Sequence, residues 1–302
     1  MSNELLVLAI RNQRLALTEN CKPAPMTLSE APKDLERRFL EAKLDSPRAD
    51  AQILLEWVTG LSAVQFRLSG TRVLTPEQET QLENAVLQRL GRYPLQLIVG
   101  EAWFYGLRLE VRPGVLIPRP ETEVLVSLAL EKLALEKLPY GARVLDIGTG
   151  TGAIALALKS ERPDLSVWAT DINPEALELT RLNAEKLGLE IHVLESDLFA
   201  ALSGRFQVIL SNPPYLPDTD RTQRPPELET EPDSSLYSGS DGLELARKLL
   251  SQAPRFLEPG GFVLLELDPR NVDALAAEQE GWTSRICADL TGRRRFLWLE
   301  RS

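Results

Sequence analysis

The chain has 302 residues, of which 43% are hydrophobic and 26% are charged, a composition typical of a globular protein long enough for two modest domains. Its formal net charge of −10 argues against general binding to a nucleic-acid backbone, which needs clustered Lys and Arg. The two cysteines, Cys21 and Cys287, are far apart and predict neither a disulfide scaffold nor a zinc site, and we expect no signal peptide and no membrane span.

The first part of the chain is predicted to be helical. Residues 1–26 are expected to form an N-terminal extension, and residues 27–93 a bundle of three or four short helices. Ser46-Pro47 and Thr75-Pro76 are typical helix starts, with proline at the first helical position. The apolar positions expected to face the core of the bundle are Leu35, Phe39, Leu40, Leu44, Ala51, Ile53, Leu54, Leu55, Val58, Leu82, Val86 and Leu90.

Residues 94–119 are predicted to form a β-hairpin linker. Ala102–Tyr105 and Leu107–Val111 are short runs on either side of Gly106, a pattern typical of two antiparallel strands joined by a tight turn that contains glycine. A helix from Pro120 through about Lys137 is then expected to open the last domain.

Residues 120–302 contain a nucleotide-binding pattern. A buried strand over Arg143–Ile147 leads into Gly148-Thr149-Gly150-Thr151-Gly152 and a packed helix from Ala153, the entry of a doubly wound α/β sheet. A second strand ends at Asp171, 23 positions after Gly148, close to the roughly 20-residue spacing at which an acid reaches a ribose diol. Through Ala153 the loop also fits the dinucleotide pattern GxGxxG/A, so a nicotinamide-dependent dehydrogenase remains an alternative.

A second motif, Asn212-Pro213-Pro214-Tyr215, distinguishes a methyltransferase from a dehydrogenase. It directly follows a strand predicted over Phe206–Ser211. Two prolines fix φ and remove N–H donors, so we expect a stiff elbow at the carboxyl end of the strand. The Asn212 oxygen and a backbone carbonyl can accept both hydrogens of a planar –NH2 group, while Tyr215 packs against the group. Hydride transfer needs no such cradle, whereas methyl transfer to nitrogen does. The plainer interpretation is a rigid turn.

The remaining segments complete the predicted domain. Strands are expected at Gly261–Glu266, at Phe296–Glu300 and around His192, and helices over Asn173–Leu187 and Gly242–Leu250. We interpret His192 as a packing or surface residue. The long proline-rich stretch from Tyr215 to Tyr237 is either a substrate lid or a surface loop.

Several strings of this chain resemble the bacterial peptide chain release factor N5-glutamine methyltransferases, from about Thr27 to Leu299. The most diagnostic is Pro113–Glu123, and Asn212–Tyr215 and Asp241–Leu243 agree with it. Three residues depart from the family pattern: Ser238 replaces one Gly of a usual pair, Leu198 stands where some members carry Trp, and Asp268 where Gly is common.

The resemblance implies an α/β fold with a seven-stranded Rossmann-like methyltransferase domain, joined by the hairpin to an N-terminal helical bundle that binds the release factor. It implies methylation of N5 of the glutamine in the Gly-Gly-Gln motif of the release factor, with S-adenosylmethionine as methyl donor. The predicted cofactor-binding residues are Gly148, Thr149, Gly150, Thr151, Gly152, Asp171, Asp197, Leu198 and Asn212. The predicted substrate-binding residues are Asn212, Pro213, Pro214 and Tyr215, of which Asn212, Pro213 and Tyr215 are expected to be catalytic.

We further expect a cytoplasmic monomer without a metal and without a direct nucleic-acid or membrane partner. Three alternatives to this function stay open, and one is the nicotinamide-dependent dehydrogenase already named. An N6-adenine or other exocyclic-amine nucleic-acid methyltransferase would face the same –NH2 geometry, although it would normally carry a basic surface for a flipped base. A non-catalytic scaffold that only senses the cofactor is the third.

Overall fold

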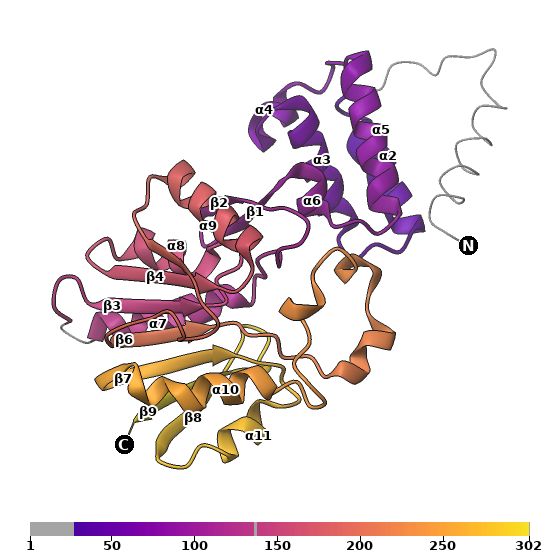
Figure 1. Cartoon of the computed structure of the whole chain (residues 1–302). Helices are drawn as coiled ribbons and strands as arrows, with labels where there is room; N and C mark the ends of the chain where they lie inside the picture. Colours follow the sequence, from indigo (N-terminus) through magenta and orange to yellow (C-terminus); the bar gives the residue numbers. More distant parts are fainter. Residues whose placement is uncertain (1–26, 136–137, 302) are drawn as a thin grey trace. The chain divides into compact units, whose positions relative to one another are not determined.

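The computed structural model describes residues 27–135 and 138–301, and these separate into two compact units with the boundary between Val99 and Gly100 (Figure 1). The boundary falls inside the segment 94–119 that was predicted as a linker. The expected extension over residues 1–26, with Cys21, lies outside the described residues.

The first unit is helical, as predicted. Within residues 27–99 its helices are α2 (Ala31–Glu41), α3 (Pro47–Thr59), α4 (Ala63–Leu68), α5 (Pro76–Leu90) and α6 (Leu95–Val99). The predicted starts of α3 and α5 are confirmed, each with proline in the first turn. At α5, the Thr75 hydroxyl accepts a hydrogen bond from Gln78 N, and Gln78 Oε1 accepts one from Thr75 N, a capping box that satisfies two backbone donors.

Two of the predicted core positions in this unit are wrong. Leu40 is 58% exposed and Ile53 is 41% exposed, whereas their neighbours Phe39 and Leu54 are fully buried. Successive helical residues are turned by about 100°, so a residue next to a buried one leaves the apolar stripe. The short helix α6 was also not predicted, because its five residues are too few to show a helical period.

The second unit begins with a hairpin of β1 (Glu101–Phe104) and β2 (Leu107–Glu110), which confirms the predicted pair of strands. Tyr105 and Gly106 both have positive φ, 49° and 75°, as a two-residue hairpin turn of the I′ class requires.

The main sheet of this unit has seven strands in the order β5-β4-β3-β6-β7-β9-β8, and β9 runs antiparallel to both neighbours. This confirms the predicted seven-stranded α/β fold. The strands are β3 (Arg143–Ile147), β4 (Ser166–Asp171), β5 (His192–Glu195), β6 (Phe206–Ser211), β7 (Leu257–Glu266), β8 (Trp282–Ala288) and β9 (Arg294–Arg301).

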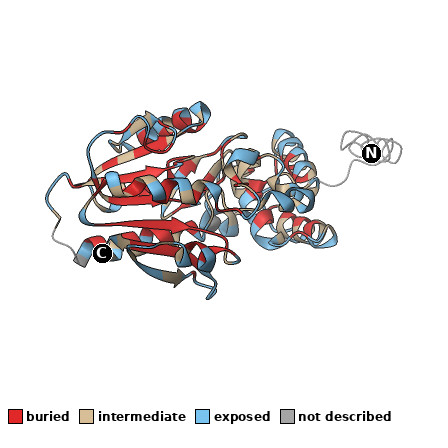
Figure 2. Cartoon of the chain, turned by 60° about the horizontal axis from the view of Figure 1, so that its bottom comes forward, coloured by how far each residue is buried: buried red, intermediate tan, exposed pale blue. Residues whose placement is uncertain are grey.

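Helices cover both faces of this sheet, and the central strands between them are buried (Figure 2). Val144 of β3 packs in a cluster with α7 (Thr122–Leu135) and α8 (Ala153–Glu161), with α9 (Pro174–Leu187) on the same side. The next residue, Leu145, faces the opposite cluster, with α10 (Glu244–Gln252) and α11 (Val272–Ala277). This alternation explains why the central strands are apolar on both faces.

Two predicted helix starts were early by two residues. The helix expected from Pro120 begins at Thr122, and the one expected from Gly242 begins at Glu244. His192 is confirmed as a surface and packing residue: it is exposed, and its ring stacks on Trp168 with 4.4 Å between the centroids.

The strand register places three segments at one edge of the sheet. Ile147 at the end of β3 pairs with Thr170 of β4 on one side and with Ser211 of β6 on the other. The next residues of these strands are Gly148, Asp171 and Asn212, so they come together although they span more than 60 positions. The strand order reverses between β3 and β6, and ligands of doubly wound sheets bind at such a reversal.

Candidate active site

The glycine-rich loop after β3 is held by the neighbouring strand. Gly148 N and Thr149 N both donate to the Thr170 carbonyl, at 2.8 and 2.9 Å. Gly152 has a φ of 84°, and a Cβ atom there would lie only 3.0 Å from side-chain carbons of Leu156 and Thr180. The last glycine of the loop therefore allows close packing of α8, in agreement with its absence from the cavity wall.

A buried carboxyl lies beneath this loop. Asp146 is fully buried, and one of its oxygens accepts the Thr149 hydroxyl at 2.7 Å. The other oxygen, Oδ1, has no hydrogen-bond partner among the described residues. Burial raises the pKa of Asp146 to about 7, against the effect of the Thr149 and Ala155 donors.

Asp171 binds the loop from the end of β4. Its two oxygens accept hydrogen bonds from Gly150 N and Asn173 N, both at 2.9 Å. Burial raises the pKa of Asp171, while these backbone donors favour its charged form. Each carboxylate oxygen has a second acceptor site, so Asp171 can hold the loop and still accept a ribose hydroxyl.

Two apolar side chains line the cavity near Asp171. Ile172 is 63% exposed and Leu198 is buried. Leu198 has a φ of 50°, rare for a residue with a branched side chain, and Ser196 supports it by donating to its carbonyl at 2.9 Å. The sequence reasoning missed Ile172; the available signal was an apolar residue directly after the acid at a strand end. Asp197, also in the wall, is exposed.

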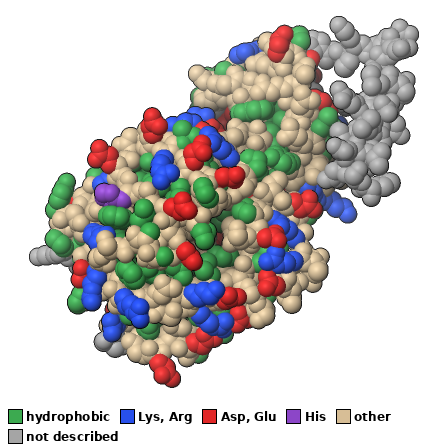
Figure 3. Space-filling model, in the orientation of Figure 1, with side chains coloured by type: hydrophobic (Ala, Val, Ile, Leu, Met, Phe, Trp, Pro, Cys, Tyr) green, Lys and Arg blue, Asp and Glu red, His purple; other side chains and the backbone are tan. Residues whose placement is uncertain are grey.

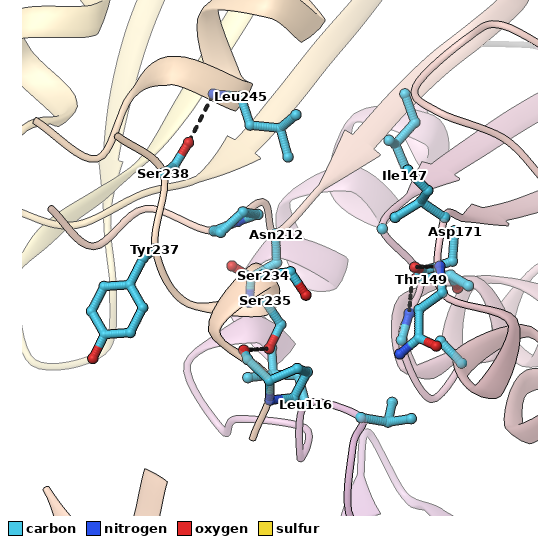
Figure 4. Close-up of a pocket in the computed structure, with 18 of the residues that line it drawn as sticks. Leu116, Ile147, Thr149, Asp171, Asn212, Ser234, Ser235, Tyr237, Ser238 and Leu245 are labelled. Atoms are coloured by element: carbon cyan, nitrogen blue, oxygen red, sulfur yellow. Dashed lines mark hydrogen bonds between the residues drawn. The ribbon is translucent and has the colours of Figure 1, made fainter. Parts of the chain in front are cut away.

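Asn212 lies at the centre of the cavity wall. Figure 4 shows it between Thr149 and Asp171 on one side and Tyr237 and Ser238 on the other. Its Nδ2 donates to the Thr122 hydroxyl at 3.1 Å, and no described residue donates to its Oδ1. The asparagine oxygen is therefore the group of this side chain that is available as an acceptor.

The other elbow residues have different surroundings. Pro214 lines the cavity, whereas Pro213 and Tyr215 do not. Tyr215 packs against the core cluster on the α10 side of the sheet, and burial raises the pKa of its hydroxyl. Its carbonyl accepts Asn271 Nδ2 at 3.1 Å. The predicted contacts of Pro213 and Tyr215 with a substrate amide stay predictions.

The cavity has a volume of about 530 Å³, within the usual range for small-molecule sites. Its wall also includes the hairpin through Phe104, the segment before α7 through Leu116 and Arg119, and the stretch after the elbow through Ser234, Ser235 and Tyr237. One cavity thus connects the glycine-rich loop with the proline-rich stretch, which can cover a bound group.

That proline-rich stretch is folded into three 3₁₀ turns, Asp218–Gln223, Pro226–Leu228 and Asp233–Ser235. Its anchor is Glu231, which is 3% exposed. Glu231 Oε1 accepts Ile117 N at 3.1 Å, and Oε2 accepts Arg119 Nη2 at 2.6 Å. This segment is therefore bound through Glu231 to the chain before α7.

Two further observations concern the described residues as a whole. No three His, Cys, Asp or Glu side chains among residues 27–135 and 138–301 gather in a way that holds a metal ion. None of the helices in that part of the chain is both long enough and apolar enough to cross a membrane.

Comparison with known proteins gives two family-model matches. Residues 30–100 match the PrmC N-terminal domain, and residues 124–224 match the Methyltransferase small domain. A release factor glutamine methyltransferase of Deinococcus radiodurans is 48% identical over 267 residues, covering 88% of this chain and 95% of that protein. One from Salmonella typhimurium is 40% identical over 256 residues, covering 83% and 91%.

Solved structures support the fold. A 16S rRNA guanosine-N2 methyltransferase of T. thermophilus, in complex with AdoMet and guanosine, has a TM-score of 0.50 and 22% identity, covering 67% of this chain and 50% of that one. The hMettl16 catalytic domain, in complex with a MAT2A 3′UTR hairpin, has a TM-score of 0.51 and 16% identity, covering 76% and 84%. At these identities the likeness concerns the Rossmann-like fold alone.

Proposed function

Since the chain belongs to the release factor glutamine methyltransferase family, we propose that it methylates the side-chain amide nitrogen, N5, of the glutamine in the Gly-Gly-Gln motif of peptide chain release factors. S-adenosylmethionine supplies an already activated methyl group when it is bound. The task left to the protein is to place the amide nitrogen and to stabilise the charge that develops on it.

The residues around the cavity fit S-adenosylmethionine. The loop residues 148–151 bring backbone close to the cavity, and Asp171 offers free acceptor sites for the ribose. Ile172 and Leu198 offer apolar surface for the adenine ring. Asp197 and Thr149 are further polar groups in the same wall, and the cavity continues past Asn212 toward Ser235, which leaves room for a substrate side chain.

The observation that carries the proposal is the orientation of Asn212. A glutamine amide is a poor nucleophile because its nitrogen lone pair is delocalised into the carbonyl. An acceptor aimed at the amide hydrogens favours positive charge on that nitrogen as it attacks the methyl group. Asn212 Oδ1 is such an acceptor, because Nδ2 is occupied by Thr122 at 3.1 Å. We assign the second acceptor to the Pro213 carbonyl and the contact with the amide plane to Tyr215.

The proposal is tested with Asn212→Ala and Asn212→Asp in single-turnover methyl transfer at saturating cofactor. Asn212→Ala should bind cofactor nearly normally and lose on the order of 100- to 1000-fold in rate, as for removal of one preorganised polar contact. Asn212→Asp still accepts hydrogen bonds and should keep partial activity. Wild-type rates in both variants would show that Asn212-Pro213-Pro214-Tyr215 is only a rigid turn.

The substrate class is tested by mass spectrometry of candidate release factors after incubation with the wild-type chain and labelled S-adenosylmethionine. The alternative substrate is an exocyclic amine of a nucleic acid, and oligonucleotides belong in the same assay. The formal net charge of −10 favours the protein substrate. On the face of the second unit drawn in Figure 3, Lys and Arg are also interspersed with Asp and Glu, with no basic surface for a flipped base there.

The same proposal covers partner and location. We assign binding of the release factor to the helical unit. This unit carries none of the cavity residues, and it presents exposed apolar side chains such as Val64 and Leu68. A protein that modifies release factors has to meet them in the cytoplasm. We propose that it acts there as a monomer, which size-exclusion chromatography with light scattering will test.

A further inference from the structure

The acceptor role of Asn212 depends on which end of its amide faces the cavity. The oxygen attracts the N–H groups of a substrate amide, and the –NH2 end repels them. The two ends have nearly the same shape, so packing alone does not choose between them. In this structure the choice is made by Thr122, which accepts a hydrogen bond from Asn212 Nδ2 at 3.1 Å. A hydroxyl can also donate, however, so a lone threonine would hold either orientation.

A buried carboxyl lies at the strand end next to Asn212, since Ser211 of β6 pairs with Leu265 of β7 and Glu266 follows it. Glu266, the last residue of β7, is 1% exposed, and neither of its oxygens accepts a hydrogen bond from any described residue. Thr122 is itself 4% exposed. The Thr122 hydroxyl favours the charged form of Glu266, although the pair does not meet hydrogen-bond geometry in this structure. Burying a carboxyl without a hydrogen-bond partner lowers the free energy of unfolding, so we expect Glu266 to have a donor.

The charged groups around Glu266 come from several elements. Arg295 of β9 and Arg119 before α7 favour its charged form and Glu121 opposes it, while the charge of Glu266 helps to raise the pKa of the Tyr215 hydroxyl. Both arginines are already bound to other carboxylates: Arg295 to Asp289 at 2.9 Å and Arg119 to Glu231 at 2.6 Å. Neither makes a hydrogen bond to Glu266, and the Thr122 hydroxyl is the donor near Glu266 that also contacts Asn212.

We propose that Glu266 and Thr122 are positioning residues that fix the polarity of Asn212. Charged Glu266 accepts the Thr122 O–H, so the Thr122 oxygen can serve Asn212 only as an acceptor. Asn212 must then present Nδ2 to Thr122 and Oδ1 to the cavity. This inference rests on the proposed amide-holding role of Asn212 and adds the reason why its oxygen faces the substrate.

The arrangement makes the rate sensitive to pH. Burial raises the pKa of Glu266 to about 7, against the effect of Thr122 and the two arginines. Once protonated, Glu266 becomes a donor to the Thr122 oxygen, and the Thr122 O–H turns toward Asn212. Asn212 then accepts with Oδ1 and presents –NH2 to the cavity. The single-turnover rate should therefore fall as the pH drops through about 7, at saturating cofactor and substrate.

The test compares Thr122→Val, Thr122→Ser and Glu266→Gln with wild type in single-turnover methyl transfer to a release factor between pH 5.5 and 8.5. Thr122→Val keeps the shape and removes the hydroxyl, and should lose about tenfold in rate at pH 8, with cofactor affinity within twofold of wild type. Thr122→Ser restores the hydroxyl and should recover the rate. Glu266→Gln is neutral at every pH, like protonated Glu266, so it should show the slow low-pH rate of wild type with a flat pH profile.

The outcomes are distinguishable. If wild type does not methylate release factors at all, the proposed function fails. If wild type is active and Thr122→Val matches it, or if Thr122→Ser is as slow as Thr122→Val, the positioning role is wrong. Asp146 is the rival source of an inflection, because its pKa is also raised to about 7. An inflection that persists unchanged in Glu266→Gln would assign the pH dependence elsewhere and overturn the inference.

Discussion

Replacing Gly242 by alanine should displace the elbow without touching the cavity. Gly242 is outside the cavity wall and precedes α10. A Cβ atom there would lie 2.1 Å from the Tyr215 carbonyl oxygen and 3.0 Å from Asn271 Nδ2. Asn271 also joins the same two segments, because it donates to the carbonyls of Tyr215 and Asp241 at 3.1 and 3.2 Å. The methyl group therefore pushes against a backbone that is tied in place.

These contacts set the expected loss of methyl-transfer rate and of folding stability in Gly242→Ala. The Tyr215 oxygen must move by about 0.9 Å to reach even the 3.0 Å limit that real Cβ contacts respect. A displacement of about 1 Å in a catalytic group can cost on the order of 100-fold in rate. Folding stability should also fall, by about 1–2 kcal/mol for an alanine at a φ of 78° and by about 1–3 kcal/mol for the overlap.

The assay is single-turnover methyl transfer together with S-adenosylmethionine affinity by calorimetry and unfolding in urea. Gly242→Ala should bind the cofactor nearly as well as wild type and transfer methyl about 100-fold more slowly. Gly281→Ala is the matched control, since Gly281 has a φ of 77° and no atom within 4 Å of the added Cβ. Gly281→Ala should lose only about 1–2 kcal/mol of folding stability, the part that comes from alanine at positive φ, and its methyl-transfer rate should equal that of wild type. A Gly242→Ala enzyme as fast as Gly281→Ala would refute the idea that this contact sets the elbow.

Three further predictions concern other parts of the chain. Asp171→Ala should weaken S-adenosylmethionine binding by about 1–3 kcal/mol in calorimetry, and unchanged affinity would remove Asp171 from the site. Burial raises the pKa of Glu266 from 4.5 to about 7, so its contribution to stability is present below pH 4.5 and is lost as the pH rises through about 7. Glu266→Gln should therefore exceed wild type in stability at pH 8, by up to about 3 kcal/mol, and match it near pH 4; an equal gain at both pH values would contradict this origin. Val64→Asp and Leu68→Asp should raise KM for an intact release factor roughly tenfold and leave a short Gly-Gly-Gln peptide unaffected; equal effects on both substrates would exclude a docking role.

Much of the second unit could be predicted because its signals are local. Buried parallel strands such as β3 and β6 are short apolar runs bounded by glycine or proline. Strand β8 was not located, because it lies at the sheet edge and exposes Thr283, Ser284 and Arg285, so neither an apolar run nor a clean alternation is present. The prediction of seven strands therefore came from the family resemblance and not from local sequence patterns.

The site residues also divide into those that local sequence signals predict and those that only the tertiary structure reveals. The loop, Asp171 and Asn212 each follow a recognisable strand, and the register brings them together at one edge. Thr122 and Glu266 could not be predicted, since their role comes from contacts between segments about 90 positions or more apart in the chain. The core contacts of the Tyr215 ring on the α10 side come from tertiary packing and could not be predicted from the motif, while its contact with a substrate amide stays a prediction.

Because the proline-rich stretch is bound near both of its ends, the number of residues between those contacts can vary. Leu216 bridges to Tyr237, and Glu231 is fixed by Ile117 and Arg119, so the turns between them form a closed loop on a rigid base. Doubling the length of a flexible loop costs only about 0.6 kcal/mol in closure entropy. Insertions at Pro225 and Pro226, which are exposed and outside the cavity wall, should therefore be tolerated, with the anchor and Asn212 left in place. This stretch is where the enzyme can change in size to suit a differently shaped protein partner while the chemistry stays the same.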